Sequence, residues 1–239
     1  MDNHFIVIAI IIFLASFVQG FSGFGFALVS IPLLTLFIDI KTAVPLGALC
    51  GFVVNIYLSI GLKQHFNFSE LRKIILGSIL GIPIGVMILN LGSPDFLKII
   101  LGIFVVSFVI LNLAKVVQPR EVSSNWGYLA GILSGFFGGA FNTNGPPILI
   151  YFLLKGWDKV KQKAMISGFF LVTSAIIVSS HIISGITTAD ILFEFIKLLP
   201  IVIVGIWLGT VLFKYVSTEL FNKIVLWGLL IIGAGLILR

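Results

Sequence analysis

Long apolar segments separated by short polar breaks dominate the chain. A helix needs about 20 apolar residues to cross roughly 30 Å of hydrocarbon, and six segments fit that length. Turn-forming residues lie between them, for example at 92–95 and 184–185. The predicted spans cover residues 42–62, 71–91, 96–113, 164–183, 193–213 and 220–238. The hydrophobic pattern therefore predicts an all-α polytopic membrane protein.

Two other apolar stretches, residues 5–38 and 126–154, fit neither one span nor two. As a single helix at 1.5 Å per residue, the first would be ~51 Å long. Glycine-rich and polar residues interrupt both stretches, at 20–25 in the first and at 138–139 and 142–147 in the second. We expect each stretch to form a re-entrant hairpin of two half-helices. Irregular backbone at membrane depth is tolerated only against protein or a water-filled cavity.

The positions of the 15 Lys and Arg residues favour these hairpins over full crossings. If both broken stretches crossed the membrane, seven basic residues would lie on one side and eight on the other. If both return to their starting side, eleven lie on one side, leaving only Lys41, Lys98, Lys197 and Arg239 on the other. Positive charge concentrates in cytoplasmic loops. The re-entrant arrangement is therefore predicted, with both termini outside.

The two halves of the chain resemble each other at a nearly constant offset. Gly20, Phe21, Gly23, Phe26, Pro32 and Phe37 recur 115 residues later as Gly135, Phe136, Gly138, Phe141, Pro147 and Phe152. We therefore predict two homologous repeats, residues 1–118 and 119–239, each a hairpin followed by three spans. Three crossings are an odd number, so the second repeat is inverted relative to the first. Inverted repeats with broken helices are common in transporters that bind their substrate near the midplane.

Composition excludes several other classes of protein. Of the 239 residues, 59% are hydrophobic and 10% are charged, against roughly a quarter charged in a soluble domain. A soluble globular domain, a disordered tail and a nucleic-acid-binding module are therefore excluded. We expect the residues that give the net charge of +6 to lie mainly in the loops between spans. The single cysteine, Cys50, excludes an intrachain disulfide. Acidic Asp2 replaces the basic start of a signal peptide, so the first apolar stretch is expected in the mature protein.

The two hairpin tips are the predicted binding site for a small anion. They contain no Lys or Arg, so the N–H groups and positive dipole ends at the starts of the second arms would attract the anion. Pro146 and Pro147 suit the first turn of such a helix, and Thr173 with Ser174 are placed to complete the cavity. The predicted binding residues are Gln19, Gly20, Ser22, Gly23, Asn55, Gly138, Gly139, Asn142, Thr143 and Asn144.

Each of these residues also has an alternative role. The tip glycines suit close helix packing, which is the preferred role of the Gly-x-x-x-Gly pairs Gly81 with Gly85 and Gly205 with Gly209. The polar run at 142–144 also suits a helix cap. Ser and Thr in a helix commonly bond back to their own backbone. Metal ligands and cofactors are not expected, because the three histidines are widely separated.

The same residues are similar to those of a known family, the TauE/SafE sulfite exporters. The resemblance extends over almost the whole chain and depends on residues 20–25 with Pro32, and on residues 135–139 with the proline pair 146–147. It implies a multi-pass protein of the prokaryotic inner membrane with two homologous halves. The implied substrate is a small sulfur-containing anion such as sulfite, thiosulfate or a sulfonate. The implied partners are that anion and the lipid bilayer, and a homo-oligomer is compatible with this assignment.

The chain carries no sign of an ion-coupling device or of an enzyme. No Asp or Glu lies centrally in a predicted span, so a carboxylate proton relay is not expected. With the cytoplasm negative, export of each negative charge gains ~2.3 kcal/mol per 100 mV, so uncoupled export suffices. Neither a His-Glu-x-x-His motif nor a Gly-x-Ser-x-Gly elbow occurs. The alternatives that stay open are import of the same anions and a passive channel for water or a small solute.

Overall fold

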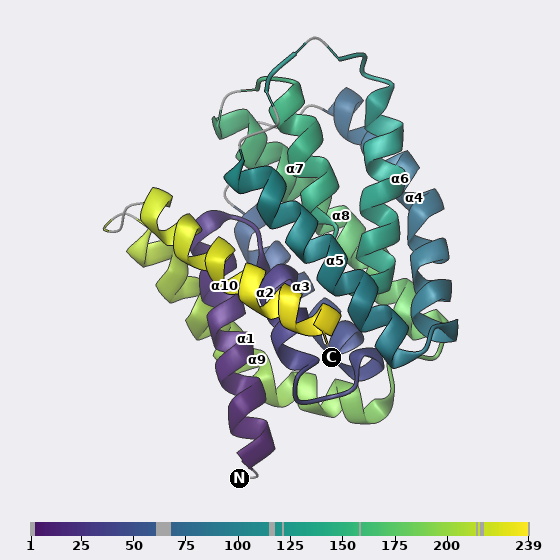
Figure 1. Cartoon of the computed structure of the whole chain (residues 1–239), viewed down its shortest axis with the longest axis vertical. Coiled ribbons are helices and arrows are strands. Elements are labelled where there is room, and N and C mark those ends of the chain that lie inside the picture. The colour runs from purple at the N-terminus through teal and green to yellow at the C-terminus, as the bar shows by residue number, and fades with distance from the viewer. Residues whose placement is uncertain are drawn as a thin grey trace.

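The computed structural model describes residues 3–60, 68–114, 118–120, 122–157, 159–213, 215 and 218–238. Within these residues it consists of ten helices and contains no strand (Figure 1). The helices are α1 (Asn3–Ser22), α2 (Phe26–Leu34), α3 (Ile40–Ser59), α4 (Phe68–Leu91), α5 (Pro94–Leu113), α6 (Trp126–Phe141), α7 (Gly145–Leu154), α8 (Lys159–Ile183), α9 (Ala189–Leu212) and α10 (Thr218–Leu238). The predicted all-α class is confirmed.

Six helices of the described ranges are long and apolar enough to cross a membrane. They are His4–Ser22, Ile40–Ser59, Ser69–Leu91, Pro94–Leu113, Ala164–Ile183 and Ala189–Leu212. The last five coincide with predicted spans, within a few residues at each end. The predicted span at 220–238 is helix α10, whose described apolar part is the shorter segment Lys223–Leu238. The remaining candidate, His4–Ser22, lies in α1, where a half-helix was expected.

The first arm of the first hairpin is therefore longer than predicted. Helix α1 has 20 residues, about 30 Å at 1.5 Å per residue, because it continues through Gly20 and ends only after Ser22. The chain breaks where Gly23 and Gly25 adopt φ values of 83° and 105°, which glycine reaches without a steric penalty. The left-handed glycines, rather than the first glycine of the run, thus set the position of the bend.

The second apolar stretch breaks over residues 142–144. Asn142 has a φ of 56° and ends α6, and α7 begins at Gly145. Pro146 and Pro147 lie in the first turn of α7, as predicted. Proline is tolerated there because the first N–H groups of a helix have no intrahelical acceptor. Here α6 has 16 residues and α7 has 10, so both arms are shorter than a full span.

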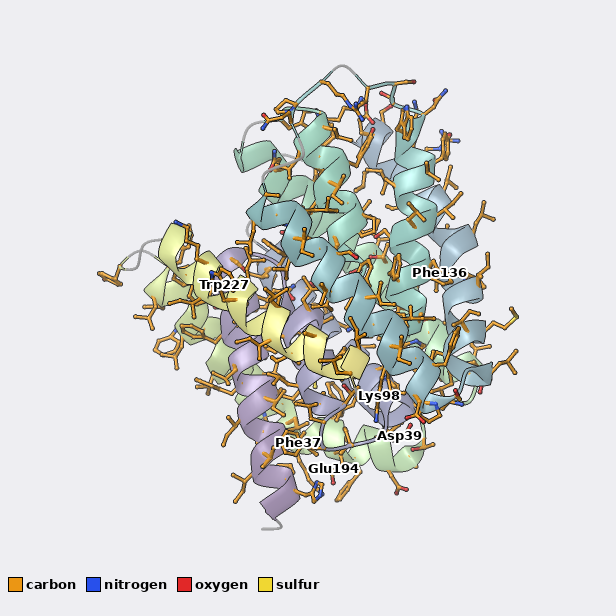
Figure 2. All side chains as sticks on the ribbon, in the orientation of Figure 1. Phe37, Asp39, Lys98, Phe136, Glu194 and Trp227 are labelled. Atoms are coloured by element: carbon orange, nitrogen blue, oxygen red, sulfur yellow. The ribbon has the colours of Figure 1, made fainter. Side chains whose placement is uncertain are left out.

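Each broken stretch returns to the end of the molecule at which it begins. Ser124, before α6, donates to Glu70 Oε1 over 2.6 Å, and Lys155, after α7, lies 3.5 Å from the same oxygen. We call this the Lys155 end. The N-terminus lies at the opposite end, as does Phe37 after α2, and we call this the Phe37 end (Figures 1 and 2). The two hairpins therefore enter the helix bundle from opposite ends.

The helices pair reciprocally across the two halves of the chain. The most extensive contact joins α4 to α6, and the next joins α1 to α9. In addition, α3 packs against α8, and α5 packs against α10. The first arm of each hairpin thus lies along a long helix of the other half. Figure 1 shows α1 beside α9 and α6 beside α4.

Glycines make the closest of these contacts possible. A Cβ added at Gly81 or Gly85 of α4 would collide with a backbone carbonyl oxygen of α6, that of Ile132 or Phe136. A Cβ at Gly209 of α9 would collide in the same way with the carbonyl oxygen of Phe17 in α1. Small residues let helix backbones approach closely in a membrane. The packing role predicted for the Gly-x-x-x-Gly pairs is confirmed.

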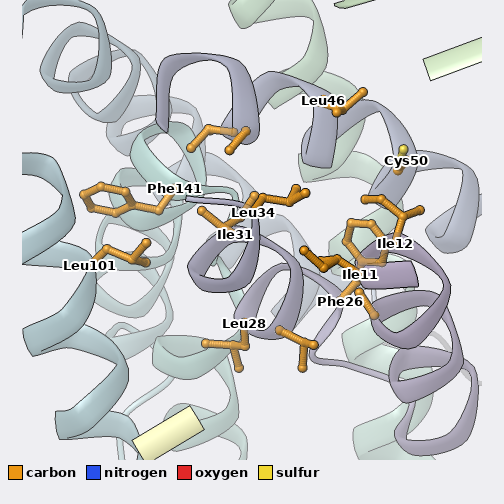
Figure 3. Packing of buried hydrophobic residues seen from close by; sticks show 14 of the residues in the cluster. Ile11, Ile12, Phe26, Leu28, Ile31, Leu34, Leu46, Cys50, Leu101 and Phe141 are labelled. Carbon is orange, nitrogen blue, oxygen red and sulfur yellow. The ribbon is translucent and has the colours of Figure 1, made fainter. Parts of the chain in front are cut away.

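The first hairpin lies at the centre of the largest apolar cluster (Figure 3). Ile12 of α1, Ile31 of α2 and Cys50 of α3 are fully buried in it. Phe141, the last residue of α6, is buried in the same cluster. The tips of the two hairpins are consequently held against one shared core.

Candidate functional site

A small cavity lies between the two hairpin tips. One wall is formed by the bend and first turn of α2, and the facing wall by residues 142–145. Side chains from α1, α3 and α8 close the remaining sides. Its volume is about 30 Å³. Because one water molecule requires roughly 10–15 Å³, the cavity has room for a group the size of a few waters.

Five of the ten predicted binding residues line this cavity. They are Gln19, Asn55, Asn142, Thr143 and Asn144. Although they come from separate parts of the sequence, they surround one space at the meeting point of the hairpins. Ser174, which the sequence placed beside the site, also lines it.

At the first tip, Gln19 links three helices. Its Nε2 donates to Asn55 Oδ1 over 2.7 Å, and its Oε1 accepts the N–H of Phe26 over 3.1 Å. Gln19 is only 4% exposed, and its bond with the N–H of Phe26 is buried. The side chain thereby fixes the start of α2 relative to α1 and α3.

At the second tip, Asn144 links the start of α7 to α6 and α8. Its Nδ2 donates to Thr173 Oγ1 of α8 over 2.9 Å, and its backbone carbonyl accepts the hydroxyl of Ser134. Thr173 and Ser174 in turn donate to carbonyl oxygens of their own helix, which is the alternative role that the sequence left open. Thr173 therefore positions Asn144, whereas Ser174 forms part of the cavity wall.

Asn142 differs from these partnered amides. Its backbone N–H donates to Gly138 O over 2.7 Å, but its side-chain amide forms no hydrogen bond with any residue that the structure describes. The residue is 8% exposed and lines the cavity. Its amide is consequently available to bind a solute. The hydroxyl of neighbouring Thr143 makes only a long bond, 3.4 Å from Oγ1 to Phe137 O.

The cavity also faces the N-terminal ends of α2 and α7. The residues preceding these helices, Gly25 and Asn144, make no side-chain cap. The first N–H groups of a helix have no acceptor within it. Those of Ala27 and Leu28 find none elsewhere among the described residues, whereas the prolines at the start of α7 have no N–H. The first tip thus supplies backbone donors, and the second supplies the Asn142 amide.

The electrostatic character of the cavity comes from dipoles rather than from charges. None of its described lining residues is ionisable. The N-terminus of a helix carries a partial positive charge of roughly half an elementary charge. Two such ends directed at one cavity favour an anion and disfavour a cation.

The predicted glycines lie outside the cavity lining. A Cβ at Gly20 would lie 2.5 Å from Ile206 O of α9, and one at Gly139 would collide with Ile82 O of α4. A Cβ at Gly138 would lie 2.9 Å from Asn144 Cβ. Gly23 supplies a turn with positive φ. These glycines therefore shape the tips and let helices approach, without contact to the cavity.

Ser22 also lies outside the cavity. Its hydroxyl is within 2.8 Å of Val18 O and 2.5 Å of Phe24 O, and it also receives the N–H of Phe24 over 3.4 Å. Ser22 lines a neighbouring cavity instead. Its role is to hold the bend of the first hairpin.

Sequence reasoning missed Gly51 and Phe170, which both line the cavity. A Cβ at Gly51 would lie 3.2 Å from the Phe26 ring and 3.4 Å from Asn142 Nδ2. Without a side chain here, the tips can approach α3. Both residues lie four positions before a polar residue that was singled out, Asn55 or Ser174, and residues four apart share a helix face. That spacing is the signal that identifies them.

Comparison with known proteins agrees with the geometry. A family model described as sulfite exporter TauE/SafE matches residues 8–236. The match includes the bends of both hairpins and every residue of the cavity. Comparisons with curated proteins and with solved structures found no match. The family is one of membrane transporters of sulfur-containing anions, not of enzymes. With its apolar helices long enough to span a membrane, this multi-pass membrane protein belongs to the TauE/SafE sulfite exporter family.

Proposed function

We propose that the protein exports a small sulfur-containing oxyanion, with sulfite as the best candidate, and binds it in the cavity between the hairpin tips. The observation that carries the proposal is the donor set around this cavity. Backbone N–H groups of Ala27 and Leu28 and the side-chain amide of Asn142 lack partners among the described residues and border one space. Family membership supports the sulfur chemistry.

Anion binding without a fixed cation is physically reasonable at this site. A hydrogen bond to a charged group contributes about 1.5–3 kcal/mol, so three or four donors offset part of the dehydration of a small ion. The two helix dipoles add a favourable potential. A site without Lys or Arg also holds its ligand less tightly, which favours release after each transport cycle.

The size of the cavity supports an inorganic oxyanion over a sulfonate with an organic tail. A volume of about 30 Å³ corresponds to only a few water-sized groups. Phe24, Phe26 and Phe170 border the cavity, so a longer molecule would have to displace aromatic side chains. Sulfite therefore fits better than taurine or sulfoacetate.

The reciprocal helix pairing supports two inverted repeats, residues 1–118 and 119–239. Exchange of the halves turns the α4–α6 pair into the α9–α1 pair and leaves the α3–α8 and α5–α10 pairs unchanged. This is the pattern expected of a two-fold relation between the repeats. We place the Lys155 end in the cytoplasm of a prokaryotic cell, because the predicted topology assigns eleven of the 15 basic residues to that side. The substrate site then lies between a hairpin from each side of the inner membrane.

Counterflow in proteoliposomes tests this function. Vesicles loaded with millimolar unlabelled sulfite are diluted into trace radiolabelled sulfite, with protein-free vesicles as the control. We expect transient accumulation of label that external sulfite inhibits in a saturable manner, with weaker inhibition by taurine. Flux proportional to concentration, without counterflow, would favour the passive channel. Counterflow of taurine but not of sulfite would contradict the substrate assignment.

A further inference from the structure

A second cavity lies on the other side of the first hairpin bend from the binding cavity. Its volume is about 60 Å³. Phe24, Gly25 and Leu28 line both cavities. The bend of the first hairpin is therefore the wall between the two spaces, and the Phe24 side chain is the largest movable group in that wall.

The second cavity leads toward the Lys155 end. Phe108 and Asn112 of α5 line it and also line a third cavity of about 310 Å³. The third cavity is bordered by Gln118 and Leu153, and Leu153 lies two residues before Lys155. Three cavities with shared walls thus form a row from the substrate site to this end of the protein.

Polar groups occur along this row at intervals. Ser22 and Asn112 line the second cavity, and Asn112 and Gln118 line the third. The Asn112 amide donates one hydrogen bond, from Nδ2 to Phe108 O over 3.1 Å. A second N–H and a carbonyl oxygen remain on this side chain. The row therefore offers hydrogen-bonding groups to an ion that has left the binding cavity.

The backbone around Phe24 is suited to movement. Phe24 lies between Gly23 and Gly25, which both have positive φ, and glycine changes between backbone conformations at little steric cost. The Ser22 hydroxyl has a single hydrogen, yet it lies within hydrogen-bond distance of both Phe24 O and Val18 O. It has an acceptor in its own helix if it releases Phe24.

We propose that Phe24 is the gate between the substrate site and the Lys155 end, and that the anion passes it along the row bordered by Ser22 and Asn112. This inference rests on the proposed function. An apolar ring offers no hydrogen bond to an anion, so the ring closes the route while it separates the cavities. Movement of the ring at the glycine pair joins the cavities, and Ser22 stabilises the closed position.

Cysteine labelling tests the gate without reference to any substrate. Cys50, the only cysteine, is first removed by Cys50→Ala. Ala27→Cys then introduces a single thiol into the binding cavity, just beyond Phe24. A membrane-impermeant thiol reagent is applied from the Lys155 side. We expect Phe24→Ala to raise the labelling rate of this thiol about tenfold and Ser22→Ala to raise it less. Phe193→Ala, which removes an exposed ring of α9, should leave the rate unchanged.

Equal labelling rates with Phe24, with Phe24→Ala and with Ser22→Ala would overturn the gate. If Phe24→Ala does not give a monodisperse protein, Phe24→Leu serves as the smaller truncation, and Phe24→Trp should slow labelling. Sulfite counterflow is measured separately. Absence of counterflow by the unmodified protein would refute the proposed function. A higher labelling rate in Phe24→Ala would still support the gate in that case.

A negative charge introduced at Asn112 tests the proposed route of the anion. Asn112→Asp places a carboxylate beside the second and third cavities and should reduce sulfite flux about tenfold by repulsion, while Asn112→Gln retains most of the flux. Asn90→Asp makes the same chemical change at an exposed position at the Phe37 end of α4 and should have little effect. If Asn112→Asp and Asn90→Asp transport equally, the anion does not pass Asn112.

Discussion

At the scale of single residues, the four side-chain amides around the binding cavity have different roles. Gln19 bonds to Asn55 and to the N–H of Phe26, and Asn144 bonds to Thr173, so Gln19 and Asn144 hold the tips in place. Asn142 has no such side-chain partner in the described part of the chain. We therefore expect Asn142 to contribute to substrate affinity, and Gln19 and Asn144 to contribute mainly to the geometry of the site.

Asn142→Ala should raise the KM for sulfite by about tenfold to a hundredfold, because a hydrogen bond to a charged group is worth about 1.5–3 kcal/mol. Thermal stability should fall only through the backbone, by about 1 kcal/mol, because alanine tolerates the φ of 56° less well than asparagine, whereas the amide has no partner to lose. Concentration-dependent flux and the melting temperature of the purified protein measure both effects. An unchanged KM would remove Asn142 from the site.

Thr173→Val is the matched control for this substitution. It leaves Nδ2 of Asn144 without its acceptor, and an unsatisfied buried polar group costs about 1–3 kcal/mol. We expect Thr173→Val to lower the melting temperature more than Asn142→Ala does, and to change the KM less. The opposite ranking of the two variants would show that the second tip binds through Asn144.

Gly51→Ala should reduce transport more than stability. Its Cβ would lie 3.2 Å from the Phe26 ring and 3.4 Å from Asn142 Nδ2, so it narrows the cavity from the α3 side. We expect a several-fold loss of flux and a melting temperature within about 4 °C of the unmodified protein, given 2–4 °C per kcal/mol. Gly228→Ala, where an added Cβ meets nothing within 4 Å, should leave flux unchanged.

At the scale of helices, hydrophobic length predicts five of the spans, because an apolar segment of about 20 residues has few other stable environments. The extent of α1 was not predictable in this way. In a run such as 20–25, the sequence does not distinguish a glycine that bends the chain from one that lets a neighbouring helix pack closely. Gly20 packs against α9, and only Gly23 and Gly25 have positive φ.

The same ambiguity limits the site prediction. Polar residues at membrane depth are costly without a purpose, and five of them do line the cavity. The predicted glycines lie against helices that are distant in sequence, and a single sequence does not reveal which helices become neighbours. Gly51 and Phe170 carry no polar group and were missed for a different reason, since neither residue type signals binding by itself.

The close contact between α4 and α6 predicts that a larger residue at Gly85 destabilises the protein. Gly85→Ala would force a methyl group against Phe136 O, and overpacking costs about 1–3 kcal/mol. This exceeds the gain of up to about 1 kcal/mol that alanine brings to a helix interior, so the melting temperature should fall. Gly235→Ala of α10, where an added Cβ is unobstructed, should leave the melting temperature unchanged or raise it. Equal effects of both substitutions would contradict the packing role.

At the scale of the whole molecule, the cavity has dipoles but no ionisable lining residue among those described. Transport of an anion through such a site should depend on voltage and not on a sodium or proton gradient. One charge moved across 100 mV is worth about 2.3 kcal/mol, which corresponds to an accumulation of about 50-fold for a monovalent anion. A potassium diffusion potential imposed on proteoliposomes measures this ratio. Accumulation driven by sodium or pH at zero potential would contradict uncoupled transport.

The reciprocal pairing of the two halves also constrains how the protein is made. Helix α1 is synthesised first, but its main partner α9 emerges near the end of translation, and α4 must wait for α6. Until then, the face of α1 that packs against α9 and the glycine face of α4 meet only lipid or the insertion machinery. A ribosome that stalls after residue 118 would therefore leave a fragment in which α1, α3, α4 and α5 all lack their partner helices, open to degradation. Co-expression of residues 1–118 with residues 119–239 should protect both fragments from degradation.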